Sequence, residues 1–292
     1  MKIIVKPVLD NLDSYIENNI DTFLLPLEEY SVSYIKYYSL DDIKAIRKKY
    51  EDINIFISIN KNIFNSEIEP LKKILQELDK LNIEGIFFYD LAILSLKKEL
   101  SLKTELVWNS TFMVTNYKTC NYYFEKGVKY ALISKEITKD EIIDIVNNTK
   151  IKTIVELISY PTVAFSKRHL VTNYYKNYDL NIKDSINVIE PISKQKYLIK
   201  EDKNGTSFIL EKLMNGSRIL KELMNTNLEY ILLQEDLIEH DIFIKCINNI
   251  NYYIKNYHNM SDNDYNNWIK KQNELLGRNT NFFYRKTIYK VK

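Results

Sequence analysis

The chain has little of several residues on which whole classes of site depend. Among 292 residues it carries two cysteines, Cys120 and Cys246, and three histidines. The cysteines lie far apart and form no CxxC pair, so neither a secreted disulfide framework nor a cysteine-rich metal site is supported. Five glycines leave little room for a GxGxxG or Walker loop, and neither pattern occurs. We therefore expect no metal and no cofactor in this chain.

An excess of charge and a long hydrophobic run are also absent. The 41 Lys and Arg residues nearly balance the 39 Asp and Glu residues, which gives a formal net charge of +2. This balance excludes a polycation that coats nucleic acid, but it permits a local basic patch. No stretch approaches the roughly 18 consecutive apolar residues that span a bilayer, and the N-terminus does not resemble a signal peptide. The sequence therefore predicts a cytoplasmic protein with no membrane association.

What the sequence does have is a regular alternation of two patterns. Short β-branched or aromatic runs are followed by longer stretches with helical periodicity, which indicates βα units and a parallel sheet. Eight strands are predicted, at Lys2–Lys6, Thr22–Pro26, Ile53–Ile59, Gly85–Tyr89, Thr104–Trp108, Lys129–Ile133, Lys152–Ile158 and Glu229–Gln234. Eight parallel strands can close without leaving edges. The sequence therefore favours a TIM-type (β/α)8 barrel over an open sheet in which the last two strands are misassigned.

One interval is too long for an ordinary βα connection. Residues 159–228 separate the seventh predicted strand from the eighth. Within them, "KYLIKEDKNGTSFIL" places two β-like runs around Asn204 and Gly205, which predicts a hairpin. We expect a barrel over residues 1–258 that includes this insertion, followed by a C-terminal extension over 259–292 that ends in an extended tail. A helix with Cys246 on its apolar face is expected to close the barrel.

The insertion begins with the most reactive stretch of the chain. "YPTVAFSKRHLVTNYY" runs from Tyr160 to Tyr175 and sets a hydroxyl, two cations and an imidazole side by side in Ser166, Lys167, Arg168 and His169. Loops that follow barrel strands form the ligand-binding end of the fold. The motif is therefore predicted at that end.

Several segments together resemble one known family. "IEGIFFYDLAILSLKKEL", "ELVWNSTFMVTNYKTCNYYFEKGVKYALISKEITKDEI", "VELISYPTVAFSKRHLVTNYY" and "YLIKEDKNGTSFIL" resemble, in this order, consecutive parts of the collagenase-like peptidase family U32. The resemblance implies a barrel-like α/β domain with a signature after a strand that ends in Glu. It also implies peptidase activity by name. Some members of the family act in hydroxylation of the wobble uridine of transfer RNA, others in hydroxylation of quinone precursors, and some carry an iron–sulfur cluster.

The departures from the family pattern concern that cluster. Thr162, Ala164 and His169 stand where cluster-bearing members have cysteines, and Ser159 replaces a glycine typical of the signature. Two cysteines cannot supply four thiolate ligands. The chain therefore resembles the shorter branch of the family that lacks the cluster.

Peptidase activity is the first functional hypothesis, on the strength of the resemblance. It would require an activated nucleophile, and Ser166 with His169 as its base are weak candidates. No GxSxG or HExxH sequence is present, and the resemblance carries no catalytic residue over to this chain. His240 is expected near a helix start and facing solvent, and His258 in a loop.

A role in transfer-RNA hydroxylation is the alternative, and on residue chemistry it is the better supported. Between Ser166 and Lys200 the chain has seven Lys or Arg and three acidic residues, a net charge of +4, interleaved with tyrosines such as Tyr174. Cations beside rings are what single-stranded RNA recognition uses. In this hypothesis the chain binds the RNA while a longer, cysteine-bearing homologue performs the chemistry.

Binding of a small anion without catalysis is a third hypothesis. Lys167 and Arg168 could hold a carboxylate or a phosphate, with Asn109, Asn116 and Glu156 as further polar groups on the same rim. The plainer interpretations are that the two cations form a solvated surface pair and that Asn109 only caps a turn. The substrate is thus a peptide, a transfer RNA or a small anion.

Overall fold

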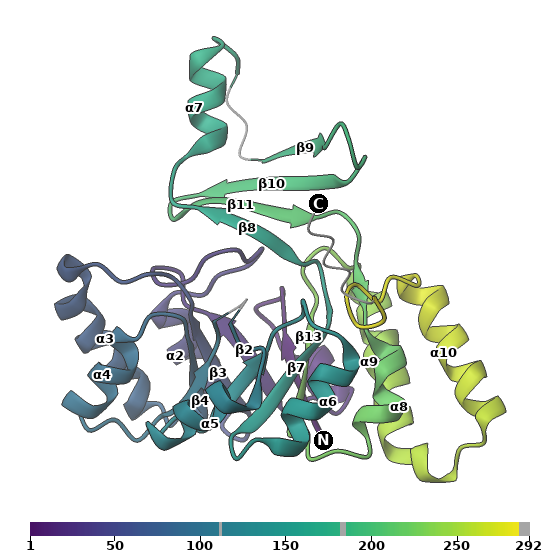
Figure 1. Cartoon of the computed structure of the whole chain (residues 1–292). Helices are drawn as coiled ribbons and strands as arrows, with labels where there is room; N and C mark the ends of the chain where they lie inside the picture. Colours follow the sequence, from purple (N-terminus) through teal and green to yellow (C-terminus); the bar gives the residue numbers. More distant parts are fainter. Residues whose placement is uncertain (111–112, 182–184, 286–292) are drawn as a thin grey trace.

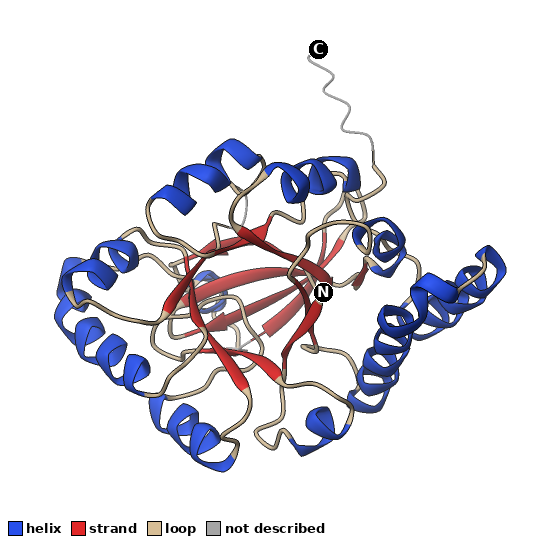
Figure 2. Ribbon diagram, turned by 90° about the horizontal axis from the view of Figure 1, so that it is seen from below, coloured by secondary structure: helices blue, strands red, loops and turns tan. Residues whose placement is uncertain are grey.

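Eight parallel strands close into a barrel in the computed structural model, which describes residues 1–110, 113–181 and 185–285 (Figure 2). The strands are β1 (Lys2–Lys6), β2 (Thr22–Pro26), β3 (Asn54–Ile59), β4 (Gly85–Phe88), β5 (Glu105–Trp108), β6 (Tyr130–Ile133), β7 (Lys152–Ser159) and β13 (Tyr230–Gln234). Each pairs with the next, β7 pairs with β13, and β13 pairs with β1, which closes the ring. The predicted TIM-type barrel is confirmed, and no predicted strand end moves by more than one residue.

The inside of the barrel is a packed core. Successive side chains of a strand point to opposite faces, and the inward set is Ile4, Leu24, Phe56, Phe87, Val107, Tyr130, Ile154, Tyr230 and Leu232. The Phe56 ring meets Phe87, Tyr130 and Tyr230 edge to face, with ring centroids 5.6–5.8 Å apart. Since these rings fill the middle of the barrel, space for a ligand remains only at an end.

Helices cover the outside of the barrel (Figures 1 and 2). They are α1 (Asp13–Glu17), α2 (Leu40–Lys49), α3 (Ile68–Lys80), α4 (Ala92–Glu99), α5 (Tyr117–Glu125), α6 (Lys139–Asn148), α8 (Leu220–Leu223) and α9 (His240–Asn256). Capping boxes start α2 at Ser39 and α6 at Thr138, so two backbone N–H groups at the start of each helix are satisfied. Among the helices that the structure describes, none has the length and apolar character needed to cross a membrane.

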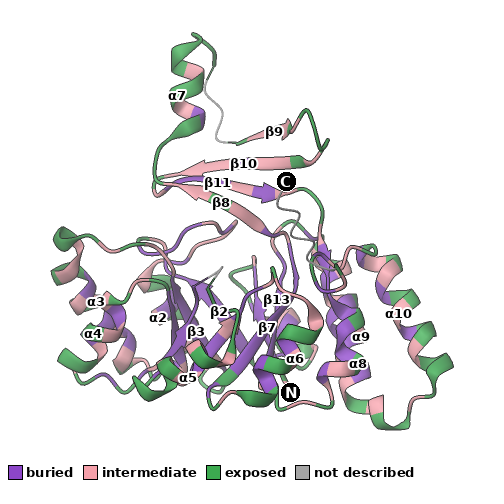
Figure 3. Cartoon of the chain, viewed as in Figure 1, coloured by how far each residue is buried: buried purple, intermediate pink, exposed green. Residues whose placement is uncertain are grey.

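The long insertion folds as a second sheet over the open end of the barrel (Figure 1). This lid sheet consists of β8 (Thr162–Ser166), β9 (Ser185–Ile189), β10 (Lys196–Asp202) and β11 (Gly205–Leu210), in the antiparallel order β8-β11-β10-β9. The predicted hairpin is confirmed as β10 and β11, whereas β8 and β9 were not predicted. Between them lies α7 (Leu170–Asn177), which is mostly exposed (Figure 3). The short strand β12 (Met214–Asn215) then returns the chain to the edge of β7.

The segment after α9 packs back onto the barrel helices. Helix α10 (Asp262–Leu276) lies against α9, where Trp268 stacks on Tyr253 with ring centroids 4.2 Å apart and Gln272 donates a hydrogen bond to the Cys246 sulfur. Cys246 is fully buried, which confirms it as a core thiol. Residues 281–284 form turns with Phe283 buried, so the extended tail is wrong for these residues; residues 286–292 lie outside the described part. The boundary at residue 258 stays a prediction.

Candidate binding cavity at the barrel mouth

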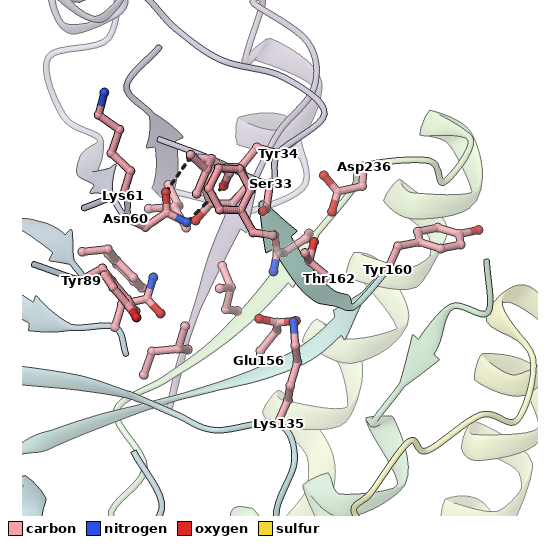
Figure 4. Close-up of a pocket in the computed structure, with 18 of the residues that line it drawn as sticks. Ser33, Tyr34, Asn60, Lys61, Tyr89, Lys135, Glu156, Tyr160, Thr162 and Asp236 are labelled. Atoms are coloured by element: carbon pink, nitrogen blue, oxygen red, sulfur yellow. Dashed lines mark hydrogen bonds and ion pairs between the residues drawn. The ribbon is translucent and has the colours of Figure 1, made fainter. Parts of the chain in front are cut away.

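A cavity of about 310 Å³ lies between the carboxyl ends of the barrel strands and the lid sheet (Figure 4). Its floor is apolar, formed by Leu24, Phe87, Leu132 and Leu232. Its walls come from the ends of the barrel strands and the loops after them, and from β8 with Thr162, Ala164 and Phe165. The carboxyl end of the strands is where ligands bind in this fold, so this cavity is the candidate site.

The inward alternation of the strands selects the polar groups at this mouth. Two residues beyond the inward Ile4, Val107, Ile154 and Leu232 come Lys6, Asn109, Glu156 and Gln234. Because the side-chain period of a strand is two residues, these four also point into the barrel, one layer above the apolar core. The same rule applied to the sequence would have found Lys6 and Gln234, which the sequence reasoning missed.

Glu156 forms a buried ion pair on one wall of the cavity. Its carboxylate lies 2.9 Å from the ammonium of Lys135, and the side chains are 7% and 11% exposed. The same carboxylate oxygen accepts a hydrogen bond from the buried hydroxyl of Ser159. Glu156 was predicted on the rim and lines the cavity, whereas Lys135 was missed.

A second buried pair joins Lys6 to Asp236. The Lys6 side chain is fully buried and Asp236 is 9% exposed. Asp236 follows the end of β13 and has a φ of +38°, a left-handed conformation that costs energy for a residue other than glycine. Burial of two charges is itself unfavourable unless the pair is well formed. A strained backbone and a buried ion pair at one position are features that folds keep at functional sites.

The lid sheet is tied to the barrel by the loop between β2 and α2. The Tyr37 hydroxyl donates to Asp202 at 2.8 Å, and the hydroxyl oxygens of Ser33 and Ser207 are 3.1 Å apart. The Lys200 ammonium donates to two carbonyl oxygens of the same loop at 3.1 Å. Burial lowers the pKa of Lys200 from its ordinary value. The loop therefore fixes the lid over the mouth, and no sequence pattern had indicated it.

The four reactive residues of the motif lie at the end of β8 and directly after it, and none of them lines the cavity: Ser166, Lys167, Arg168 and His169. The Ser166 hydroxyl accepts from the backbone N–H of Arg168 at 3.2 Å, and His169 Nδ1 lies 3.5 Å from Glu201. Among the described residues, no hydrogen bond joins Ser166 to His169. A nucleophile and its base have to meet in space, so the proximity of these residues in sequence does not by itself create a catalytic pair. Their catalytic role stays a prediction.

Glu201 holds the start of α7 to the lid sheet. Its carboxylate accepts from the backbone N–H of Val171 at 2.8 Å and from the hydroxyls of Thr172 and Thr206. Burial raises the pKa of Glu201, but these hydrogen bonds to the charged form outweigh it, and the net direction is downward. His169 therefore stands beside an ionised carboxylate that already serves a structural purpose.

The other predicted binding residues are spread over the lid and the barrel surface. Lys167 places its ammonium 3.2 Å from the centroid of the Phe64 ring, Arg168 is exposed, and Tyr174 on α7 is 53% exposed. Asn116 caps α5 by accepting from the N–H of Thr119 at 2.9 Å, and it is exposed. Of the predicted set, only Asn109 and Glu156 come together at the cavity. Lys183 and Asp184, counted in the basic stretch, lie outside the described residues.

The comparison with known families agrees with this geometry. The family model of peptidase family U32 matches residues 8–290.

The chain belongs to peptidase family U32.

Individual relatives of this U32 chain are distant. It is 24% identical over 291 residues to tRNA hydroxylation protein P2 of Bacillus subtilis (strain 168), a match that covers 91% of this chain and 92% of that protein. The solved U32 peptidase Mk0906 shares 13% identity with a TM-score of 0.48, over 80% of this chain and 92% of that one. A structure from Aquifex aeolicus VF5 shares 10% identity with a TM-score of 0.43, over 95% and 93%.

The cysteines of this U32 chain do not suit an iron–sulfur cluster. Cys120 lies on α5 and Cys246 on α9, both buried, and burial raises their thiol pKa values to about 11 and about 12. A cluster requires several thiolates around one centre, and the sequence holds no further cysteine. The described residues also contain no group of three or more His, Cys, Asp and Glu side chains placed to hold a metal ion.

His240 of the U32 chain is not the solvent-facing residue that the sequence suggested. Its Nδ1 lies 2.7 Å from Glu235 Oε1, and its Nε2 lies 3.0 Å from the Ser14 hydroxyl. Glu235 is fully buried and also accepts from the Tyr15 hydroxyl and from the backbone N–H of Val8. These groups link α1 to the start of α9, and none of them lines the cavity. His258 is exposed but lies in the short 3-10 helix Tyr257–Asn259, not in a loop.

Proposed function

We propose that this U32 chain binds transfer RNA during hydroxylation of a wobble uridine and that the mouth cavity receives the unpaired base. The observation that carries the proposal is the cavity itself, enclosed by the lid sheet and lined by rings and amides. A relative whose name is tRNA hydroxylation protein P2 supports the same function. The oxidation is assigned to a cluster-bearing homologue, because the two buried thiols here cannot hold a cluster.

The cavity has the size and lining that an isolated base needs. A volume of about 310 Å³ lies within the range of small-molecule sites. Tyr89, Tyr160 and Phe165 supply aromatic surface, and the amides of Asn109 and Gln234 supply hydrogen bonds. Proteins that act on a base take it out of its stack and hold it by stacking and by its polar edge. The lining of this cavity provides both kinds of contact.

The lid sheet supplies a surface for the rest of the RNA. Lys167 and Arg168 are exposed, and α7 presents Tyr174 and Tyr178 with ring centroids 4.9 Å apart. Exposed cations neutralise phosphates, while exposed rings stack on unpaired bases. The predicted binding residues on the lid thus act outside the cavity.

Removal of both lid cations tests this role. The double variant Lys167→Ala/Arg168→Ala is expected to weaken transfer-RNA binding and to reduce the slope of log affinity against log salt by about 1.5, since each lost phosphate contact lowers it by a little under one. Filter binding over a series of salt concentrations measures both effects. The matched control is Lys270→Ala/Lys271→Ala, which removes two exposed lysines from α10. Equal slopes for the two double variants, or no binding to the wild type at low salt, would contradict the proposal.

Hydrolysis is a second candidate because one serine is placed like a nucleophile. A carboxylate only accepts hydrogen bonds, so Glu235 fixes the proton of His240 on Nδ1. Nε2 is then left to accept the proton of the Ser14 hydroxyl. This is the order of groups in serine hydrolases. The three residues lie away from the cavity, which is why hydrolysis ranks second.

A cleavage assay separates the two candidates. Under the RNA proposal, the purified chain leaves fluorescently labelled casein intact, and Ser14→Ala changes nothing. Under the hydrolase candidate, the wild type cleaves casein, and Ser14→Ala or His240→Ala reduces the rate by about a hundredfold or more. Ser166→Ala and His169→Ala test the original pair in the same assay. Cleavage that is lost in Ser14→Ala but kept in Ser166→Ala would make this chain a hydrolase.

A further inference from the structure

Two largely buried amides face the cavity, and their side chains have no hydrogen-bond partner among the described residues. Asn109 and Gln234 are 6% and 8% exposed, and both line the cavity. Among the residues that the structure describes, neither side chain makes a hydrogen bond to the protein. Only their backbones are engaged: the N–H of Asn109 donates to the Phe88 carbonyl at 2.9 Å, and Gln234 pairs with Lys6 in the barrel sheet. Polar side chains in folded proteins are almost always paired with protein or with ordered water. Because the polar atoms of these two amides are open to the cavity, they are available to a ligand that enters it.

The side chain of another amide in the cavity lining, Asn60, shows the contrast. Asn60 also lines the cavity, but its side chain accepts from the backbone N–H of Val32 at 2.8 Å and donates to the carbonyl of Val32 at 3.1 Å. It is fully used to fix the loop between β2 and α2. Asn109 and Gln234 have no such structural duty among the described residues.

The charged side chains around the cavity are already neutralised. Of the residues that the structure describes, four charged ones line it, and each has a partner of opposite sign: Lys61 with Glu67 at 2.7 Å, Lys135 with Glu156 at 2.9 Å, and Asp236 with Lys6. Burial also raises the pKa of Tyr34 and of Tyr160, so their hydroxyls stay neutral. Within the described residues, the cavity thus offers hydrogen bonds but no unpaired cation for an anion.

We propose that Asn109 and Gln234 select a flat, uncharged group that carries an N–H beside a carbonyl, and that phosphate stays outside the cavity. A carboxamide has one acceptor and two donors, so it can pair with such an edge in both directions. Asn109 follows β5 and Gln234 ends β13, with β6 and β7 between them in the ring, so the two amides approach a ligand from different sides. The identification of this group as uracil rests on the proposed function, which the inference makes more specific.

The two cations of the lid sheet lie outside the cavity. Lys167 and Arg168 do not line the cavity, so an anion-binding role for them belongs to the outer surface. The third sequence hypothesis, a small anion held at the mouth, therefore does not extend to the cavity.

Ligand-observed NMR with the full chain tests the proposal. The probes are uridine, 3-methyluridine, uridine 5′-monophosphate and inorganic phosphate. We expect uridine to bind, 3-methyluridine to bind about tenfold more weakly or worse because its donor is blocked, and uridine 5′-monophosphate to bind no better than uridine. Inorganic phosphate should not compete. The comparison of uridine with 3-methyluridine uses the wild type alone, so it does not depend on the folding of any variant.

Variants of Asn109 and Gln234 test whether these two amides are responsible for uridine binding. Asn109→Leu and Gln234→Leu keep the approximate size of the side chain and are each expected to weaken uridine binding by at least about tenfold. Asn225→Leu, which removes an exposed amide at the end of α8, is the matched control. Competition by phosphate, equal binding of 3-methyluridine, unchanged binding by both variants, or no uridine binding by the wild type at millimolar concentration would overturn the proposal.

The inference and the proposed function fail in different ways. If a strain without the chain loses wobble hydroxylation while Asn109→Leu and Gln234→Leu bind uridine normally, only the inference is wrong. If both amides hold uridine while that strain keeps full hydroxylation, only the proposed function is wrong.

Discussion

Replacement of Asp236 by asparagine is expected to lower the free energy of unfolding by about 3 kcal/mol or more. The change leaves the fully buried ammonium of Lys6 without its partner, and an unpaired buried charge is far more costly than a lost surface contact. Asparagine tolerates the left-handed backbone of this position, so the loss reports on the charge and not on strain. Denaturant unfolding followed by circular dichroism gives the free energy.

Two further variants show whether the loss of stability in Asp236→Asn is caused by the burial of the unpaired charge. Asp262→Asn breaks an ion pair with Lys221 of 2.7 Å, but both of its side chains are at least half exposed, so no measurable change is expected. The double variant Lys6→Met/Asp236→Asn removes both charges and is expected to recover most of the stability. An effect of Asp236→Asn no larger than that of Asp262→Asn would show that the Lys6 pair does not stabilise the mouth.

Replacement of Gly205 by alanine is expected to separate β11 from β8, the first strand of the lid sheet. Gly205 has a φ of +138°, and an added methyl carbon would collide with the carbonyl oxygen of Ser166 and lie 2.9 Å from the Cα of Lys167. Backbone strain and the clash together are expected to cost about 2 kcal/mol or more. Because the damage is confined to the lid, amide exchange should accelerate over residues 185–210 while the barrel strands stay protected.

Gly127→Ala is the matched control for this change. Gly127 also has a positive φ, +88°, but no atom of the described part of the chain lies within 4 Å of the added carbon. This variant is expected to cost only the backbone strain, about 1 kcal/mol, and to leave the exchange of the lid unchanged. Similar lid exchange in both variants would show that the contact between Gly205 and Ser166 does not hold the sheet in place.

The barrel could be predicted from the sequence because its signals are local. Runs such as Ile53–Ile59 are rich in β-branched residues and alternate with helices, two of which, α2 and α6, start with capping boxes. Eight such runs imply closure. The lid strands β8 and β9 lack this signal, since their burial is partial and their pairing comes from β10 and β11. Tertiary contact, not propensity, makes them strands.

Only part of the candidate site could be predicted from the sequence, for a related reason. Asn109 and Glu156 stand out because they are polar at the end of apolar strands. Lys6 and Gln234 occupy the same layer, but they were counted as ordinary strand ends because the inward face was not assigned. Ser166 and His169 were selected because they are close in sequence. In the structure, Ser166 accepts from the backbone N–H of Arg168, whereas His169 lies beside Glu201. Proximity along the chain was a weaker guide than the inward alternation of the strands.

The most direct test of the central claim is mass spectrometry of transfer-RNA nucleosides from a strain that lacks this chain. The account predicts that hydroxylated wobble uridine disappears, that the wild-type gene restores it, and that a gene with Asn109→Leu and Gln234→Leu does not. The Asn225→Leu gene should restore it fully. Undiminished hydroxylation in the strain without the chain would contradict the claim that the cavity serves this modification.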